Sequence, residues 1–133
     1  MAQYPLLSHR TIREAVDTVS FLIHELEVSS MKIYISGPVT GVELYTQKFR
    51  NCVKKAKSRF PNAEVINPAV VCYPLPDSTT HDQYMGICLM LLGMCDTIVM
   101  MDGWRESTGA CIEYGYALAK DITVLKESDL KED

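Results

Sequence analysis

Short runs with β-strand character alternate with segments of helical spacing along most of the chain, and this alternation constrains the fold more than any other feature. The strand-like runs occupy residues 31–36, 63–66, 97–101 and 122–125. The helical segments between them occupy residues 45–60, 82–95 and 108–120. Such alternation predicts right-handed crossovers and a parallel sheet with helices on both faces. We therefore expect an α/β fold.

A further amphipathic helix is predicted before the first strand. Its apolar residues fall on one stripe with 3.6-residue spacing: Ile12, Ala15, Val16, Val19, Leu22, Ile23 and Leu26. A chain of 133 residues suits a single core. We divide it into an N-terminal helical extension (1–30), an α/β domain (31–126) and a charged tail (127–133). The domain is expected to be a three-layer Rossmann- or flavodoxin-like fold with a four- to five-stranded parallel sheet.

Composition and charge argue against several classes of protein. Hydrophobic residues make up 47% and charged residues 23% of the sequence, a balance that argues against disorder. The formal net charge of -4 provides no basic field, so DNA and RNA are not expected partners. No apolar stretch approaches the roughly 20 residues of a membrane-spanning helix, and no secretory signal pattern begins the chain. We expect a cytoplasmic protein without a membrane partner.

The five cysteines do not follow a metal-binding or disulfide pattern. They stand at positions 52, 72, 88, 95 and 111, without a C-x-x-C pair or a closely spaced histidine. We expect reduced thiols used in packing, no bound metal and no organic cofactor. His24 and His81 have no spaced partners and are interpreted as structural or solvated residues.

One predicted helix differs from the others in its hydrophobic pattern. The segment from Asp82 to Cys95 is apolar almost all round, which favours a helix buried on most sides or one used in a subunit interface. Together with the N-terminal helix, it predicts a homodimer or a higher homo-oligomer. The segment before it, from Ala69 to His81, contains Pro74 and Pro76 and is expected to be a loop in position to cover a site.

A first candidate loop for ligand binding follows the first strand. In open parallel sheets, ligands bind beyond the carboxyl ends of the strands, where the winding order reverses. The residues of this loop are Ser36, Gly37, Pro38, Val39, Thr40 and Gly41. Glycines allow close backbone approach, and free N–H groups favour an anion. The alternative is a tight turn that needs glycine for its shape alone.

A second candidate segment joins the third strand to the last helix and leads to Glu113. On a helical wheel Glu113 lies at the edge of the buried stripe, near Gly109. A partly buried carboxylate has a raised pKa and is available for chemistry; the alternative is a salt-bridged surface glutamate. Tyr34, near the end of the first strand, is either a core residue or a hydroxyl donor to a carboxylate or sugar. Trp104 is either a lid that stacks on a base or a hydrophobic plug.

Several short motifs of the chain are shared with a known superfamily. They are Lys32-Ile33-Tyr34-Ile35-Ser36-Gly37-Pro38-Val39-Thr40-Gly41, Asn67-Pro68, Tyr84-Met85, Cys95-Asp96, Gly103-Trp104, Ser107 and Gly109-Ala110-Cys111-Ile112-Glu113-Tyr114-Gly115-Tyr116-Ala117. With them, residues 31–126 resemble the nucleoside 2-deoxyribosyltransferase-like superfamily, closest to a bacterial and phage branch of it. The N-terminal helix lies outside the resemblance.

The resemblance implies roles for particular residues. It makes Glu113 the nucleophile, with Tyr34 in contact with it, and it places the sugar or phosphate side of a ligand on residues 36–41. Ser107, six residues before the glutamate, resembles the serine of the 5'-monophosphate N-glycosidases, although Thr40 stands where those enzymes have an arginine. The Ser107 hydroxyl and N–H groups such as that of Gly109 can donate hydrogen bonds to a phosphate, whereas a carboxylate at the position of Ser107 would repel it.

One position departs from the superfamily pattern. Eight residues before Asp96 the superfamily usually has an aspartate that assists departure of the base, and this chain has Cys88. A thiol with a pKa near 8.5 is a poor acid at neutral pH, and loss of a general acid costs roughly 10²- to 10⁴-fold in rate.

The sequence therefore predicts cleavage or transfer at the N-glycosidic bond of a nucleoside or nucleotide. The catalytic residues are expected to be Glu113 and Tyr34. The substrate-binding residues are expected to be Ser36, Gly37, Pro38, Thr40, Gly41, Trp104, Ser107 and Gly109. Two alternatives remain: a non-catalytic nucleotide-binding or sensing module that has lost the acid, and an interaction protein that uses its N-terminal helix.

Overall fold

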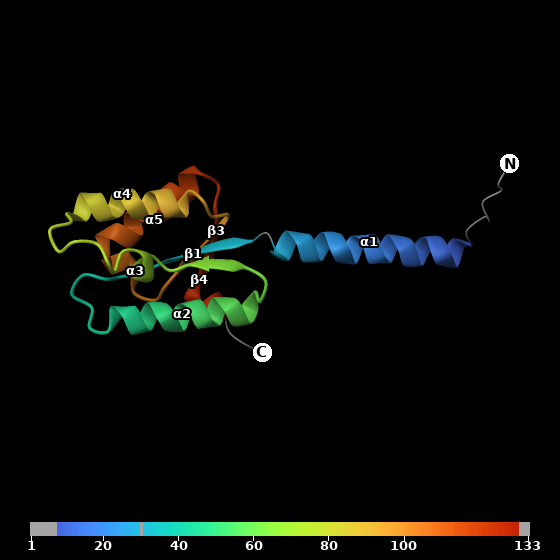
Figure 1. The fold of residues 1–133 in the computed structure, drawn as a ribbon, viewed down its shortest axis with the longest axis horizontal. Helices are drawn as coiled ribbons and strands as arrows, with labels where there is room; N and C mark the ends of the chain where they lie inside the picture. Colours follow the sequence, from blue (N-terminus) through green and yellow to red (C-terminus); the bar gives the residue numbers. More distant parts are fainter. Residues whose placement is uncertain (1–7, 30, 131–133) are drawn as a thin grey trace.

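Four parallel strands form the centre of the fold in the computed structural model, which describes residues 8–29 and 31–130 (Figure 1). The strands are β1 (Lys32–Ser36), β2 (Glu64–Ile66), β3 (Thr97–Met100) and β4 (Thr123–Lys126). Their order in the sheet is β2-β1-β3-β4, and all three pairings are parallel. The winding direction therefore reverses between β1 and β3, where open α/β sheets bind their ligands.

Helices connect the strands and cover both faces of the sheet. The α-helices are α1 (His9–Ser29), α2 (Tyr45–Arg59), α3 (Pro68–Val71), α4 (His81–Leu92) and α5 (Thr108–Ala119). Two 3₁₀ turns follow strands, η1 (Trp104–Glu106) after β3 and η2 (Glu127–Leu130) after β4. Figure 1 shows α2 on one side of the sheet and α4 with α5 on the other. The expectation of a three-layer α/β fold is confirmed, with four strands.

Alternation along β1 separates the two halves of the core. Successive side chains of a strand point to opposite faces of a sheet. Ile33 and Ile35 pack in the cluster on the α2 side, whereas Tyr34 packs in the cluster on the α4 and α5 side. Ser36 shares the face of Tyr34, and Tyr34 and Ser36 are both fully buried. Two polar side chains of β1 thus point toward α5.

Two predictions about the connecting segments are wrong in part. The segment after β2 was expected to be a loop, but it begins with the short helix α3, in which Asn67 caps the N-terminus by accepting from the Ala69 N–H. The charged tail was expected to begin at residue 127, but η2 packs back on the sheet, with Leu130 only 1% exposed. Glu127 also forms an ion pair with Lys55 at 2.9 Å.

The apolar helix α4 is less buried than its sequence suggests. Of its residues only Leu92 is fully buried, and Met90 is 76% exposed. A 12-residue helix on the outside of a three-layer fold packs on the sheet and on α5 with one side only, so its other side stays open. Among the described residues, no helix combines the length and apolarity needed to cross a bilayer.

Candidate active site

Glu113 lies in the second turn of α5 and faces the carboxyl end of β1. Its two carboxylate oxygens accept hydrogen bonds from two different side chains of that strand. The Tyr34 hydroxyl donates to Oε2, and the Ser36 hydroxyl donates to Oε1 at 2.9 Å. Because Tyr34 and Ser36 are alternate residues on a strand, a single strand face supplies both donors. The plane of the carboxylate is thereby fixed.

The carboxylate is removed from water and has no cationic partner among the residues that the structure describes. Glu113 is 6% exposed, and among the described residues no lysine or arginine forms an ion pair with it. Burial raises its pKa to about 6, while the hydrogen bonds from Tyr34 and Ser36 act in the opposite direction. The alternative that Glu113 is a salt-bridged surface residue is therefore wrong.

Tyr34 combines the two alternatives considered from the sequence. It is a fully buried core residue, and its hydroxyl also contacts the carboxylate. Burial, and next the charge of Glu113, raise the pKa of the Tyr34 hydroxyl above its ordinary value. The hydroxyl therefore remains protonated and acts as a permanent donor to Glu113.

A cavity of about 1440 Å³ opens over this carboxylate. The sequence-predicted site residues that line it are Tyr34, Gly37, Pro38, Thr40, Ser107, Gly109 and Glu113. These residues come from β1, from the loop after it and from the start of α5. Ser36 reaches the site through its bond to the carboxylate, whereas Gly41 and Trp104 do not line the cavity.

The glycines of the first loop serve the shape of the backbone. A side chain at Gly37 would place its Cβ 2.5 Å from the Met101 sulfur, closer than real contacts allow. Gly41 has φ of 72°, in the left-handed region that glycine adopts without strain. Gly37 and Gly41 are therefore explained by the shape of the turn, which was the alternative to ligand binding. Gly37 nevertheless also lines the cavity.

The N-terminus of α5 forms another part of the cavity wall. Ser107 caps the helix, and its hydroxyl oxygen accepts from the Ala110 N–H at 3.2 Å. Thr108 and Gly109, in the first helical turn, line the cavity. The positive end of the helix dipole and the unpaired N–H groups of a first turn favour negatively charged ligand groups.

The Trp104 side chain packs against the protein core and does not cover the cavity as a lid. Its ring packs on Tyr114 with centroids 4.7 Å apart, and the Arg105 guanidinium lies 5.3 Å from its ring centre. It borders the buried cluster beneath α5. A loop tryptophan can pack inward or outward, and the sequence offers no means to distinguish the two.

Cys88 lines the cavity beside Tyr34. Its thiol interacts with the Tyr34 hydroxyl and with Cys72, which also lines the cavity. Burial raises the pKa of the Cys88 thiol to about 12. The thiol at the position where the resemblance implies an acid is therefore a weak proton donor at neutral pH.

Other cavity residues were not predicted as part of the site. His81, at the start of α4, was interpreted as structural or solvated, but it lines the cavity. It lies beside Gly109: a Cβ added at Gly109 would be 3.9 Å from the His81 Nε2. Lys48 of α2 and Tyr84 of α4 also line it. These residues stand on elements that only tertiary folding brings together. Within the described residues, no group of three metal-ligating side chains is assembled.

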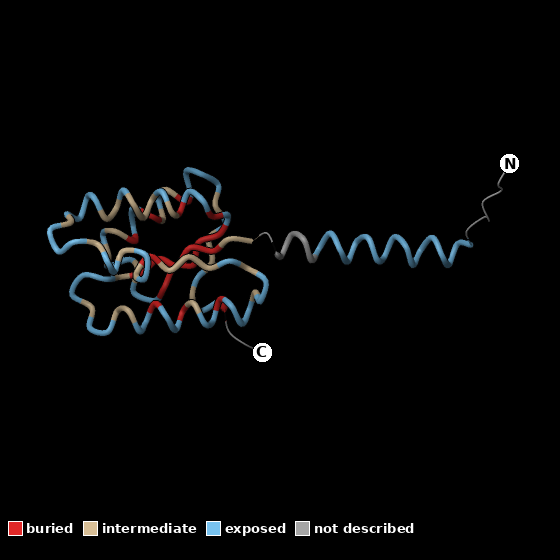
Figure 2. The backbone as a smooth tube through the Cα atoms, viewed as in Figure 1, coloured by how far each residue is buried: buried red, intermediate tan, exposed pale blue. Residues whose placement is uncertain are grey.

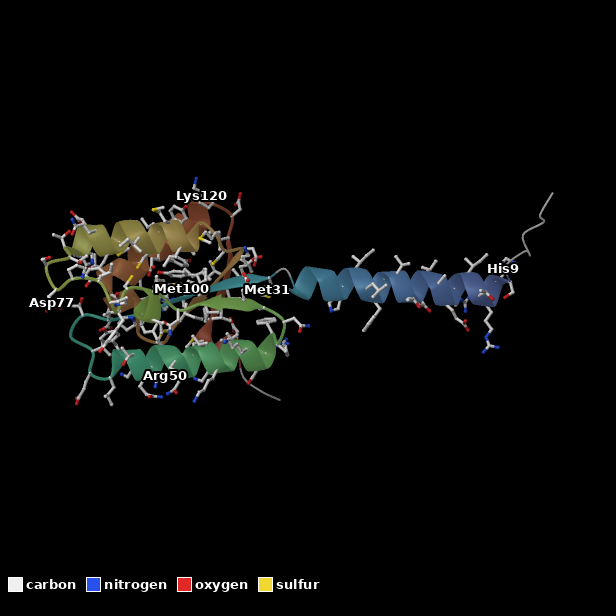
Figure 3. All side chains as sticks on the ribbon, in the orientation of Figure 1. His9, Met31, Arg50, Asp77, Met100 and Lys120 are labelled. Carbon is white, nitrogen blue, oxygen red and sulfur yellow. The ribbon has the colours of Figure 1, made fainter. Side chains whose placement is uncertain are left out.

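The segment between α3 and α4 covers one side of the cavity, as its position in the sequence suggested. Tyr73, Leu75 and Asp77 of this segment are lining residues. Figure 3 shows the labelled Asp77 in this connection, at the same end of the domain as the N-terminus of α4. Because Lys48 of α2 and Tyr84 of α4 also line the cavity, its walls come from helices on both faces of the sheet.

Comparison with known proteins identifies the family of the chain without assigning an activity. None of the curated proteins compared with the chain matches it. A family model described as "Domain of unknown function (DUF4406)" matches residues 31–126. This match spans most of the chain, from β1 to the end of β4, and excludes α1. The chain therefore belongs to the DUF4406 family.

Proposed function

We propose that the cavity binds a nucleoside or a nucleoside 5'-phosphate and that Glu113 attacks its anomeric carbon. The observation that carries this proposal is the buried Glu113 carboxylate, held by two hydroxyl donors at a large cavity and without a cation partner among the described residues. A structural carboxylate is normally neutralised by a basic side chain when it is buried. Stabilisation by neutral donors leaves the charge available for reaction.

The ionisation of Glu113 suits a nucleophile at neutral pH. With a pKa of about 6, about nine in ten Glu113 carboxylates are ionised at pH 7. The hydroxyls of Tyr34 and Ser36 each donate to one lone pair of a Glu113 carboxylate oxygen, and together they orient the carboxylate. A fixed carboxylate loses little orientational freedom when it reacts, which lowers the barrier.

The proposed reaction has two steps. A carboxylate oxygen of Glu113 forms a bond to the anomeric carbon, and the C–N bond to the base breaks, with the electron pair leaving on the base. The base takes up a proton from a donor or from water. In the second step, water or the nitrogen of another base attacks the same carbon, loses a proton and releases Glu113 as a carboxylate.

The rest of the cavity suits the sugar and its 5' substituent. The cavity that contains the carboxylate is lined both by the loop after β1, with Thr40, and by the start of α5, with Ser107 and Gly109. Hydroxyl and N–H donors at the N-terminus of α5 suit a sugar hydroxyl or a phosphate. No metal or organic cofactor takes part in this proposal.

A second candidate function is binding of a nucleotide without catalysis. The observation that favours it is Cys88, whose thiol has a pKa of about 12 where a proton donor for the leaving base is expected. A site without this acid keeps its shape and its binding groups but releases base slowly. The protein would then act as a nucleotide-sensing module.

The two candidates differ in whether base is released. Wild-type protein, Glu113→Gln and Glu106→Gln are incubated with a panel of nucleosides and 5'-monophosphates, and free base is measured by chromatography. Glu106 also lines the cavity but is exposed, so its substitution is a matched control. We expect base release by wild type and Glu106→Gln and none by Glu113→Gln. Binding by calorimetry without base release in all three would overturn the enzymatic proposal.

A further inference from the structure

The proton-bearing groups next to the Glu113 carboxylate are poor acids. The Tyr34 and Ser36 hydroxyls donate to the carboxylate itself. Cys88 follows, because its thiol interacts with the Tyr34 hydroxyl and with the charge of Glu113. Burial raises the pKa of this thiol to about 12, so it keeps its proton at neutral pH. Beside the carboxylate, the described residues therefore offer no efficient proton donor to a leaving base.

The lining histidine His81 is separated from this group of side chains along α4. The span from His81 to Cys88 corresponds to about 10 Å along the helix axis. The His81 side chain is exposed, and Figure 2 shows the start of α4 exposed as well. We therefore expect His81 to reach the solvent side of a bound ligand, with Cys88 nearer to the bond that breaks.

A leaving base needs a proton when it would otherwise depart as an anion. In a neutral nucleoside, the electron pair of the C–N bond leaves a negative charge on the base, so a general acid contributes about 10²- to 10⁴-fold to the rate. In a glycoside with a cationic base, the same electron pair neutralises the positive charge. The base then departs as a neutral molecule, and no proton is transferred. Such a substrate matches a site that has a nucleophile but no acid beside it.

The charges of the cavity also favour a cationic ligand. Four of its lining residues are acidic: Asp77, Asp102, Glu106 and Glu113. Two of the described lining residues can carry a positive charge: Lys48 and His81. Both of these are exposed, as are the acidic residues other than Glu113. Solvent screens each exposed charge, but the excess of carboxylates gives the cavity a negative potential.

Basic residues that do not line the cavity leave this excess in place. Lys55 interacts with the charge of Asp102, but it forms an ion pair with Glu127 at 2.9 Å. Arg105 is not a lining residue, and its guanidinium lies 5.3 Å from the centre of the Trp104 ring. Among the described residues, none of the four lining carboxylates forms an ion pair.

Aromatic rings in the cavity wall suit a flat cationic base. Tyr45, Tyr73 and Tyr84 are lining residues. The face of a tyrosine ring attracts a cation in addition to stacking on a base. A positive ring bound beside Glu113 would also supply the cationic partner that this buried carboxylate lacks among the described residues. During the reaction the positive charge passes from the base to the sugar, which stays next to the same carboxylate.

We propose that the substrate is an N-glycoside whose base carries a positive charge, either a pyridinium glycoside or an N7-alkylated purine glycoside. This inference rests on the proposed function, because Glu113 remains the nucleophile. A Glu113 oxygen bonds to the anomeric carbon, the C–N bond breaks, and its electron pair neutralises the cationic ring, which leaves without a proton. Water then attacks the anomeric carbon, loses a proton and releases the Glu113 carboxylate.

Base release from matched nucleosides by the wild-type protein tests the proposal. 7-Methylguanosine and guanosine share a sugar and differ by one methyl group and one positive charge, and nicotinamide riboside represents the pyridinium class. Each is supplied as the nucleoside and as its 5'-monophosphate, in a mildly acidic buffer in which 7-methylguanosine is cationic. Free base is measured by chromatography, and the uncatalysed release is subtracted.

We expect kcat/KM for at least one cationic substrate to exceed that for the guanosine substrate by at least about 10²-fold, with no release by Glu113→Gln. Equal values for guanosine and the cationic substrates would overturn this inference and leave the proposed function standing. Release of base from none of the substrates would overturn both.

A second comparison separates the missing acid from the intrinsic lability of cationic glycosides. The carboxyl of Cys88→Asp can protonate a neutral base, but a cationic base leaves without needing a proton. The ratio of kcat/KM for 7-methylguanosine to that for guanosine should therefore fall by about 10²- to 10⁴-fold in Cys88→Asp, whereas Cys88→Ser should keep the wild-type ratio. An unchanged ratio in a folded Cys88→Asp protein would contradict the proposal. If this variant does not fold, the wild-type comparison decides alone.

Discussion

The Tyr34 hydroxyl donates a hydrogen bond to the Glu113 carboxylate across 79 residues of sequence. This bond joins the central strand β1 to the helix α5 at the floor of the cavity. It couples the ionisation of the two groups: the Glu113 charge helps keep the tyrosine protonated, and the tyrosine lowers the pKa of the carboxyl, which burial raises. The stability of the fold and the charge of the Glu113 carboxylate therefore depend on the same contact.

Replacing Glu113 with glutamine should stabilise the protein at neutral pH. The carboxyl has a pKa of about 6 in the fold against an ordinary value of 4.5, so its stabilising contribution is complete below pH 4.5 and is lost as pH rises through 6. The difference corresponds to about 2 kcal/mol, because one pKa unit is about 1.36 kcal/mol. Urea unfolding of Glu113→Gln should therefore show a gain of up to about 2 kcal/mol at about pH 7.5.

The pH dependence provides the control for this prediction. Below pH 4.5, wild-type Glu113 is protonated and resembles glutamine, so the two free energies of unfolding should converge. A gain that is equal at all pH values would point to packing as its cause. A glutamine variant that is destabilised at neutral pH would contradict the raised pKa.

Removing the Tyr34 hydroxyl should shift the titration of Glu113 upward. Tyr34→Phe deletes a donor that favours the ionised carboxylate, so the pKa of Glu113 should rise above 6, and stability at neutral pH should fall by about 1–3 kcal/mol. Carboxyl carbon NMR of labelled glutamate would report the titration midpoint. Ser36→Ala should act in the same direction, because its hydroxyl holds the other oxygen. An unchanged midpoint in both variants would show that these bonds do not control the charge.

An acid introduced at Cys88 should accelerate base release. Cys88→Asp places a carboxyl close to Glu113 in a buried site, where two like charges disfavour joint ionisation and one group keeps its proton. We expect a rise of about 10²- to 10⁴-fold over wild type, measured as free base. Cys88→Ser is the size-matched control and should give no such rise. A folded Cys88→Asp variant at the wild-type rate would exclude the lack of an acid as the limit on the reaction.

A methyl group at Gly37 should disturb the loop that lines the cavity. Gly37→Ala sets its Cβ against the sulfur and Cβ of Met101, at 2.5 and 2.9 Å, and should destabilise the protein by about 1–3 kcal/mol. Gly115→Ala meets no atom within 4 Å in the middle of α5, and it should stabilise by about 0.5–1 kcal/mol. Thermal unfolding of the two alanine variants should therefore shift in opposite directions. Equal shifts would contradict the close approach of Met101.

Much of the fold was predictable because its elements carry local signals. Hydrophobic spacing predicted all four strands and the helices α1, α2, α4 and α5 to within a few residues. The short helix α3 was missed because four residues are too few to show a period. The packing of Leu130 was missed because the charged residues around it are typical of an exposed tail.

The candidate site was predictable only in part. Position at the carboxyl ends of strands and the resemblance together pointed to Tyr34, Ser107 and Glu113, and these residues line one cavity. The placement of His81 and the inward packing of Trp104 depend on how loops close over the sheet. Such contacts between distant segments leave no pattern in a single sequence.

Trapping of a covalent intermediate tests the central claim, that Glu113 is a nucleophile for a glycosyl group. Fluorine next to the anomeric carbon slows both steps by destabilising their positively charged transition states, so a 2-fluoro nucleoside or its 5'-phosphate is the probe. The protein is incubated with the probe, and intact mass and peptide maps are measured by mass spectrometry. We predict a mass increase equal to the fluorinated sugar on the peptide that contains Glu113, and none for Glu113→Gln. An adduct on another residue, or an unmodified wild-type protein that still releases base, would contradict this role of Glu113.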